Sequence, residues 1–177
     1  LAFHQGRTVR SRSVQSVVAE AQLLTTLPDF KGYIHDVGGP TANFRYPSCD
    51  KQKTAGVCPN RKCLAPTPCK HLRADHSEYL TLLQKIKALP GIKKVFIRSG
   101  LRYDYLLCDQ TGAGDAFFKE LVRDHVSGQL KVAPEHCSDA VLQDMGKPPI
   151  AVFERFKQRY FQLCASMHKE QYLVPYL

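Results

Sequence analysis

The chain has 177 residues, of which 44% are hydrophobic, and this is enough for one domain with its own core. Lys and Arg outnumber Asp and Glu by 25 to 16, and the formal charge of +9 favours an anionic partner such as nucleic acid, although a solvated basic surface explains it equally. No window resembles a signal peptide or a membrane span, so we expect a cytoplasmic protein with no membrane partner. The first residue is Leu1, and we expect a piece of a longer protein.

The first helix and strand are expected before residue 46. Ser13 predicts the N-cap of a helix from Val14 to about Leu27, because apolar residues recur there at helical spacing and Pro28 follows. A strand is expected over 33–37, and it opens into Gly38, Gly39 and Pro40. Two residues without Cβ let the backbone approach a ligand closely, and a plain turn at the strand end is the alternative.

A cysteine-rich insertion occupies about residues 46–71, which are rich in Pro and Lys and have no periodic apolar face. Eight, four and five residues separate its cysteines, which are Cys49, Cys58, Cys63 and Cys69. A loop of this length needs a staple, and four thiolates can close a tetrahedral zinc shell or hold an iron–sulfur cluster. Reduced structural thiols or a redox pair are the alternatives, and His71 or His76 could replace one cysteine. The other cysteines, Cys108, Cys137 and Cys164, are predicted to be buried thiols.

Helices and strands alternate along the rest of the chain. Helices are expected over 77–89, the ten or so residues before His125, 139–145 and 150–168, and strands over 93–100, 129–136 and 171–177. This alternation predicts an α/β fold with a parallel sheet. The strand over 129–136 has an unusual polar face, formed by Gln129, Lys131, Ala133 and Glu135. Such a face is typical of a strand that lines a ligand cavity, and an exposed edge is the alternative.

Three polar or glycine-rich segments follow the predicted strands, and the ends of parallel strands meet at one rim. They are Gly38-Gly39-Pro40, Arg98-Ser99-Gly100 and Glu135-His136. Their convergence predicts a ligand site. The neighbours His35 and Asp36 point to opposite faces of a strand, so we do not expect them to act as an acid–base pair.

Several long motifs resemble those of one family. They are GYIHDVGGPTANF, the insertion with CPNRKC, VFIRSGLRYDYLL, HVSGQLKVAPEHCSDAVLQDMGKP and QYLVPYL. In this order, and over nearly the whole chain, they resemble the YgiQ-type radical S-adenosylmethionine proteins. The resemblance implies an α/β fold, a partial (β/α)6 barrel with parallel strands, its first strand missing, over residues 1–177, with the insertion at about 46–71.

The same resemblance implies cofactors and site residues. A reduced 4Fe-4S cluster, supplied with electrons by flavodoxin or ferredoxin, would cleave S-adenosylmethionine to a 5′-deoxyadenosyl radical. Gly38 and Gly39, with Pro40 beside them, would contact the methionine amino group. The carboxylate and ribose would be held by polar groups on later strand ends, namely Arg98, Ser99, Lys131 and Glu135. The substrate is unknown, and no catalytic residue is identifiable in these residues.

One departure from the family concerns the cluster ligands. The CxxxCxxC motif does not occur in the sequence, and in the family it comes just before a segment like Leu1 to Ser13. We therefore expect the parent protein to be the enzyme and this fragment alone to be inactive. The four-cysteine insertion is expected to hold structural zinc or an auxiliary iron–sulfur cluster. A basic, zinc-stapled module that binds RNA or an anionic protein surface is the alternative.

Overall fold

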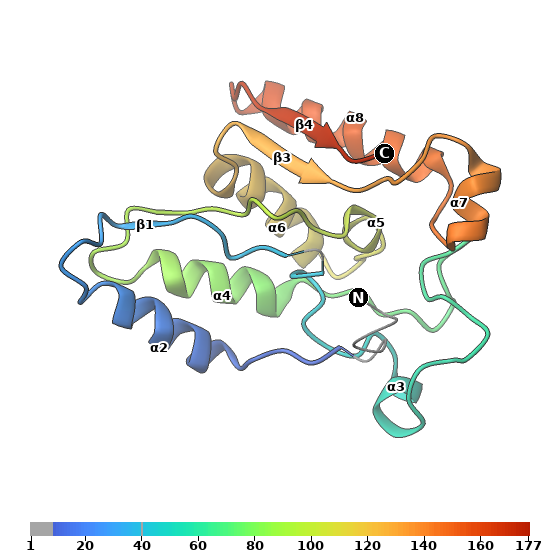
Figure 1. Ribbon diagram of the computed structural model, residues 1–177, viewed down its shortest axis with the longest axis horizontal. Helices are drawn as coiled ribbons and strands as arrows, with labels where there is room; N and C mark the ends of the chain where they lie inside the picture. Colours follow the sequence, from blue (N-terminus) through green and yellow to red (C-terminus); the bar gives the residue numbers. More distant parts are fainter. Residues whose placement is uncertain (1–8, 40) are drawn as a thin grey trace.

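Helices and short strands alternate in a computed structural model that describes residues 9–39 and 41–177 (Figure 1). The helical segments are α2 Val14–Leu24, α3 Asp50–Thr54, α4 Ser77–Lys87, α5 Tyr103–Leu106, α6 Ala113–Glu120, the π-helical turn η1 Leu121–His125, α7 Asp139–Met145 and α8 Ile150–Ser166. The strands are β1 Tyr33–Ile34, β2 Lys94–Val95, β3 Gln129–Val132 and β4 Tyr172–Pro175. None of the helices in the described ranges is both long enough and apolar enough to cross a membrane.

The strands pair in parallel, as the alternation of elements predicts. β1 pairs with β2, with Tyr33 opposite Lys94, and β3 pairs with β4, with Gln129 opposite Tyr172. The strands expected over 33–37 and 93–100 are each only two residues long in the structure. Backbone hydrogen bonds between the two segments nevertheless continue beyond Ile34 and Val95. The amide of Phe96 donates to the carbonyl of Ile34 at 2.9 Å, and the amide of Val37 donates to the carbonyl of Phe96 at 2.8 Å. The two pairs are separate small sheets, and the partial barrel stays a prediction.

The two pairs approach each other where β2 runs on toward its end. The amide of Ile97 donates to the carbonyl of His125, at the end of η1, at 2.9 Å. Gly100 has a φ of +88°, and a Cβ at this position would lie 2.9 Å from the carbonyl oxygen of Lys131. Only glycine tolerates both the left-handed backbone and this contact. The chain after β2 therefore packs directly against the backbone of β3.

One face of the strands is buried by helices and the other is exposed. The core contains α4, α6, η1 and α8, and its fully buried side chains include Leu83, Ile97, Phe118, Leu121, Leu130 and Phe156. The rings of Phe118 and Phe156 stack 5.2 Å apart, and burial of each such side chain contributes about 1.5–3 kcal/mol. In β3 the side chains alternate between exposed and buried. The polar face predicted for this strand is thus confirmed as the uncovered one.

The helix ends follow from local sequence. The hydroxyl of Ser13 accepts a hydrogen bond from the amide of Ser16 at 3.2 Å, which confirms the predicted N-cap. At the other end, α2 stops at Leu24, three residues earlier than expected. The amide of Leu27 donates to the carbonyl of Leu24 at 3.2 Å, so the chain continues in tighter turns up to the proline.

A buried polar network joins three segments that are distant in sequence. The Nδ1 of His76 lies 2.7 Å from a carboxylate oxygen of Asp109, and its Nε2 lies 3.1 Å from the amide nitrogen of Asn43. The side chain of Asn43 also donates to the carbonyl of Arg102 at 3.0 Å and accepts from its amide at 2.9 Å. Because these two backbone bonds fix the orientation of the Asn43 amide, His76 must accept at Nε2 and carry its proton on Nδ1. This network occupies both ring nitrogens, so the idea that His76 replaces a cysteine as a metal ligand is wrong.

Candidate functional site

Asp36 connects the ends of β1 and β2. Its Oδ1 accepts hydrogen bonds from the backbone amides of Gly38 at 2.7 Å, Arg98 at 2.9 Å and Ser99 at 3.3 Å. Its Oδ2 accepts from the Ser99 hydroxyl. Partial burial raises the pKa of Asp36, but these hydrogen bonds outweigh it and hold the pKa below its ordinary value. The carboxylate is therefore ionised at neutral pH and fixes two of the three predicted segments of the rim.

Gly38 is required by this arrangement. A Cβ at Gly38 would lie 2.5 Å from Oδ1 of Asp36 and 3.1 Å from a methyl group of Ile97. At Gly39 the nearest atom to such a Cβ would be the Cβ of Ala42, at 3.8 Å. The first glycine thus makes room for the carboxylate, whereas the second leaves open space beside the backbone. Pro40, the third residue of the predicted segment, lies outside the described residues.

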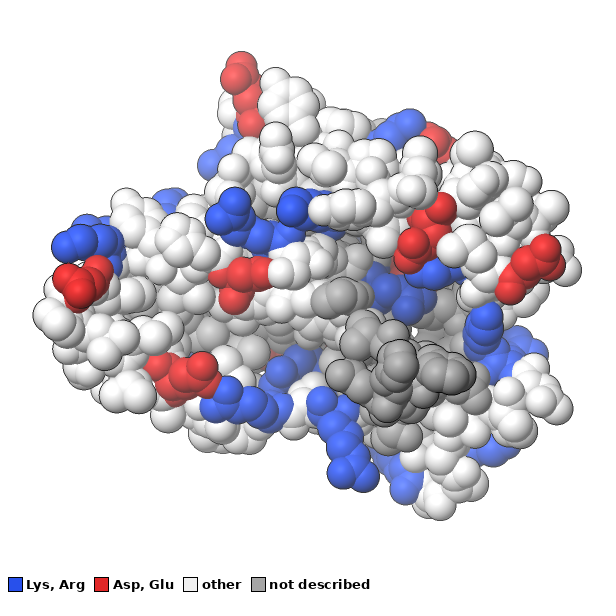
Figure 2. Space-filling model, viewed as in Figure 1, with Lys and Arg blue, Asp and Glu red and all other residues white. Residues whose placement is uncertain are grey.

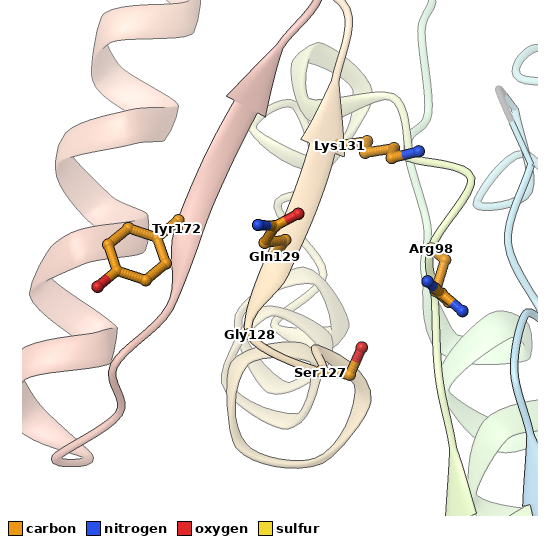
Figure 3. A pocket seen from close by; sticks show the side chains of 6 residues that line it. All are labelled: Arg98, Ser127, Gly128, Gln129, Lys131 and Tyr172. Atoms are coloured by element: carbon orange, nitrogen blue, oxygen red, sulfur yellow. The ribbon is translucent and has the colours of Figure 1, made fainter.

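A hollow of about 270 Å³ lies between β2 and the β3–β4 pair. Arg98 and Lys131 line it together with Ser127, Gly128, Gln129 and Tyr172 (Figure 3). Lys131 extends from β3 toward the segment that carries Arg98, and both side chains are exposed (Figure 3). The close approach of Gly100 to the backbone of Lys131 holds the two segments together. The resemblance to the family implies that these two cations share a site, and in the structure both line one hollow.

Glu135 lies just beyond β3 and outside the lining of this hollow. Its φ is +76°, in the left-handed region that non-glycine residues seldom adopt. Its amide donates to the carbonyl of Tyr176 at 2.9 Å, and its carboxylate accepts from Lys147 at 2.7 Å. The strand expected to run to residue 136 thus ends early, because the chain turns here to present a side chain that Lys147 holds in place.

Basic side chains are visible on the exposed face around these residues. Figure 2 shows Lys and Arg side chains over the middle of this face, with acidic side chains beside them. Such a field attracts carboxylates and phosphates. The cations that line the hollow are thus suited to an anionic group, whereas the exposed carboxylate of Asp36 is bound by backbone amides and that of Glu135 is paired with Lys147.

The insertion brings its cysteines into one region. Gln52 of α3 donates from its side chain to the thiol of Cys63 at 3.4 Å, and the amide of Cys69 donates to the carbonyl of Cys63 at 2.8 Å. Burial, followed by the charges of Cys49, Cys69 and Cys58, raises the pKa of the Cys63 thiol. The other three cysteines of the insertion are thus within electrostatic range of Cys63.

These side chains do not form a finished metal shell. Within residues 9–39 and 41–177, no three His, Cys, Asp or Glu side chains are close enough to share a metal ion. No disulfide joins any of the seven cysteines, all of which lie in those ranges. Of the other three, Cys164 is buried and Cys108 is partly buried. Cys137 is exposed, so the prediction that it is a buried thiol is wrong, because it follows the turn at Glu135 that leads away from the core.

Sequence reasoning missed several residues that shape the site. The role of Asp36 in joining two strand ends depends on the register of those strands, which the sequence does not show. Lys147 sits after a helix with no pattern that pairs it with Glu135. The signal that could have revealed Asp36 is its position two residues before a glycine, since an Asp side chain readily accepts from the amide two residues later.

Sequence comparison identifies relatives of this chain. The described structure has two pairs of parallel strands, and Arg98 and Lys131 line a hollow beside them. Over all 177 residues the chain is 56% identical to a UPF0313 protein of Clostridium perfringens strain SM101, of which it spans 26%. It is 55% identical, again over its whole length, to a UPF0313 protein of Clostridium botulinum strain Okra, of which it spans 27%. UPF0313 is the designation of the YgiQ-type family, so these relatives carry the family that the motifs indicate.

The chain spans about a quarter of the length of these curated relatives. No family model matches the chain, and no solved structure matches it. The name UPF0313 specifies no activity, so the function rests on the residues of the site.

Proposed function

We propose that this chain is part of a radical S-adenosylmethionine enzyme of the YgiQ type and that its strand ends hold S-adenosylmethionine. The observation that carries the proposal is the hollow shared by Arg98 and Lys131. Two cations there fit the carboxylate of a methionine moiety, since charge-assisted hydrogen bonds to carboxylates are among the strongest in proteins. The motifs that resemble the family, and the identity of 55–56% to UPF0313 proteins, support the same reading.

The residues around the hollow fit different parts of this ligand. Arg98 and Lys131 would bind the carboxylate, and the open backbone at Gly39 would approach the ammonium group. Glu135 would accept from ribose hydroxyls, and its ion pair with Lys147 orients it for this role. Ser99 would not contact the ligand through its hydroxyl, because that hydroxyl already donates to Asp36. It would act as a positioning residue that maintains the hydrogen bonds from the amides of Arg98 and Ser99 to the Asp36 carboxylate.

The cluster ligands are not among these residues, because the chain has no CxxxCxxC spacing. A 4Fe-4S cluster held elsewhere in the longer protein would supply the electron that cleaves the sulfonium to a 5′-deoxyadenosyl radical. The residues described here would bind and orient the sulfonium ligand. Flavodoxin or ferredoxin would reduce the cluster. The substrate from which the radical would abstract hydrogen is unknown.

The test uses the full-length protein with its iron–sulfur cluster reconstituted without oxygen. Formation of 5′-deoxyadenosine is measured as a function of S-adenosylmethionine concentration, with chemical reductant in excess. We expect Lys131→Met to raise the KM by about tenfold or more, which corresponds to about 1.4 kcal/mol of lost binding. Lys94→Met is the matched control, since Lys94 is exposed on β2 but does not line the hollow.

Two results would overturn the proposal. One is an iron-loaded protein that does not cleave S-adenosylmethionine. The other is a KM that changes equally in Lys131→Met and Lys94→Met. Binding to RNA that weakens steeply with salt and ignores S-adenosylmethionine would instead support a basic binding module.

A further inference from the structure

The insertion has little packing of its own. α3 has no buried residue. The buried residues at 46–71 are Ser48, Leu64 and Ala65, and the small apolar cluster around Leu64 and Tyr105 anchors only the later part of the loop. Burial of so few side chains offsets little of the conformational entropy that is lost when such a loop is ordered. Another interaction must hold the earlier part.

Hydrogen bonds bring the cysteine segments toward one point. Gln52 uses both ends of its side-chain amide, because its oxygen accepts from the amide of Ser48 at 3.1 Å and its nitrogen donates to the Cys63 sulfur. This links the segment of Cys49 to that of Cys63, and the backbone bond from Cys69 links the third segment. The segments of Cys49, Cys63 and Cys69 are therefore joined at Cys63.

We propose that Cys49, Cys58, Cys63 and Cys69 bind one structural zinc ion. Four ligands complete a tetrahedral zinc shell and leave no open position, which suits a stapling role. Zinc binding displaces the thiol protons, so the four side chains would bind the ion as thiolates. Zinc must also draw the sulfurs inward, because no three of the described ligand-type side chains are yet within metal-sharing distance. Binding and tightening of the loop would therefore be one event.

The zinc loop would also support the rim of the candidate site. Lys62, between Cys58 and Cys63, donates to the carbonyl of Met145, the last residue of α7, at 2.9 Å. Figure 1 shows the loop after α3 running up beside α7. The chain then turns at Gly146 into Lys147, which pairs with Glu135. A fixed zinc loop would thus hold Lys62 in place as a cap on α7, next to the turn that positions Lys147.

The test is the zinc and iron content of the full-length protein, measured by mass spectrometry of the metals. We expect about one zinc ion per chain in the unmodified protein. Cys63→Ser should lose this zinc, whereas the matched control Cys137→Ser should keep it, since Cys137 is exposed outside the insertion. A zinc content that does not change in Cys63→Ser would overturn the proposal, as would iron and acid-labile sulfide that disappear with the same substitution.

A second pair of variants covers the case in which Cys63→Ser fails to fold. Histidine also ligates zinc, so Cys58→His should retain the metal while Cys58→Ser loses it. Equal retention, or equal loss in two folded variants, would contradict a zinc site that includes Cys58. Failure here is distinct from failure of the proposed function, because zinc content is measured independently of iron content and of 5′-deoxyadenosine formation.

Discussion

The carboxylate of Asp36, at the end of β1, accepts a hydrogen bond from the hydroxyl of Ser99, which lies beyond β2. The same carboxylate also accepts from three backbone amides. One side chain therefore sets the spacing of two strand ends.

Asp36→Ala should destabilise the fold, because it leaves these donors to water or without partners. We expect a loss of about 1–3 kcal/mol in the free energy of unfolding, measured by urea denaturation. The control is Asp29→Ala, at an exposed position after α2, which should change this free energy by less than about 0.5 kcal/mol. Equal effects in the two variants would show that Asp36 does not hold the strand ends.

Adjacent glycines should respond differently to alanine. Gly38→Ala places a Cβ against Asp36 and Ile97, and we expect it to cost about 1–3 kcal/mol, as overpacking does. Gly39→Ala meets only Ala42 at an ordinary distance, so any loss there comes from the backbone, whose φ is +159°, and not from packing. A Gly38→Ala variant with an unchanged urea midpoint would contradict the packing described here.

His76 should make stability depend on pH. Burial lowers the pKa of His76, and the nearby charge of Asp109 only partly opposes this. Below about pH 6.5 the unfolded chain binds a proton that the folded chain does not, so stability should fall with decreasing pH by up to about 1.4 kcal/mol per pH unit, until the pH passes the folded-state pKa. Above pH 6.5 this contribution is complete.

The direct measurement for His76 is its ring proton resonance as a function of pH, because other histidines also affect global stability. The resonance should titrate below pH 6.5. Titration at or above that value would mean that Asn43 does not force the neutral ring, and the assigned tautomer would be wrong.

Gly146→Ala should loosen the contact between the insertion and α7. The residue has a φ of +65°, and an alanine Cβ would occupy the space that the Lys62 side chain fills. Gly112→Ala is the matched control, since its φ is +83° and a Cβ there would meet nothing within 4 Å. Both should lose about 1–2 kcal/mol from backbone strain.

Only Gly146→Ala should also increase amide hydrogen exchange around residues 58–63. This is the expected result of losing the bond from Lys62, and it is measured by mass spectrometry of the exchanged peptides. Equal exchange in both variants would show that Lys62 does not hold the insertion to α7.

Periodicity and capping residues predicted the longer helices, whereas every strand is shorter than expected. Helix α7 begins after Ser138 and ends at Met145, as expected. The long helix expected over 150–168 ends two residues earlier, at Ser166. α3 and α5 were not predicted, because each is about one turn long and carries no repeated apolar spacing. Short helices of this kind depend on tertiary contacts more than on propensity.

Part of the site could also be read from the sequence. The alternation of side chains in β3 was enough to place Lys131 on the polar face of the strand. Its closeness to Arg98 depends on the packing of Gly100 against the backbone of β3, because β2 and β3 belong to separate sheets. The left-handed backbone of Glu135 and its pairing with Lys147 could not be read, because no sequence signal forces a non-glycine residue into that region. The same applies to the network of Asn43, His76 and Asp109, whose members are brought together only by the packed fold.

The bond between Lys62 and the end of α7 has a thermodynamic consequence for the two proposals taken together. If the metal loop and the rim at Glu135 share this contact, the occupancy of each site biases the other, and the coupling free energy is the same in both directions. A ligand that immobilises Glu135 and Lys147 would then slow the escape of zinc to a chelator, just as the metal would strengthen binding of that ligand. The rate at which the insertion releases zinc would then report whether a ligand is bound at the strand ends.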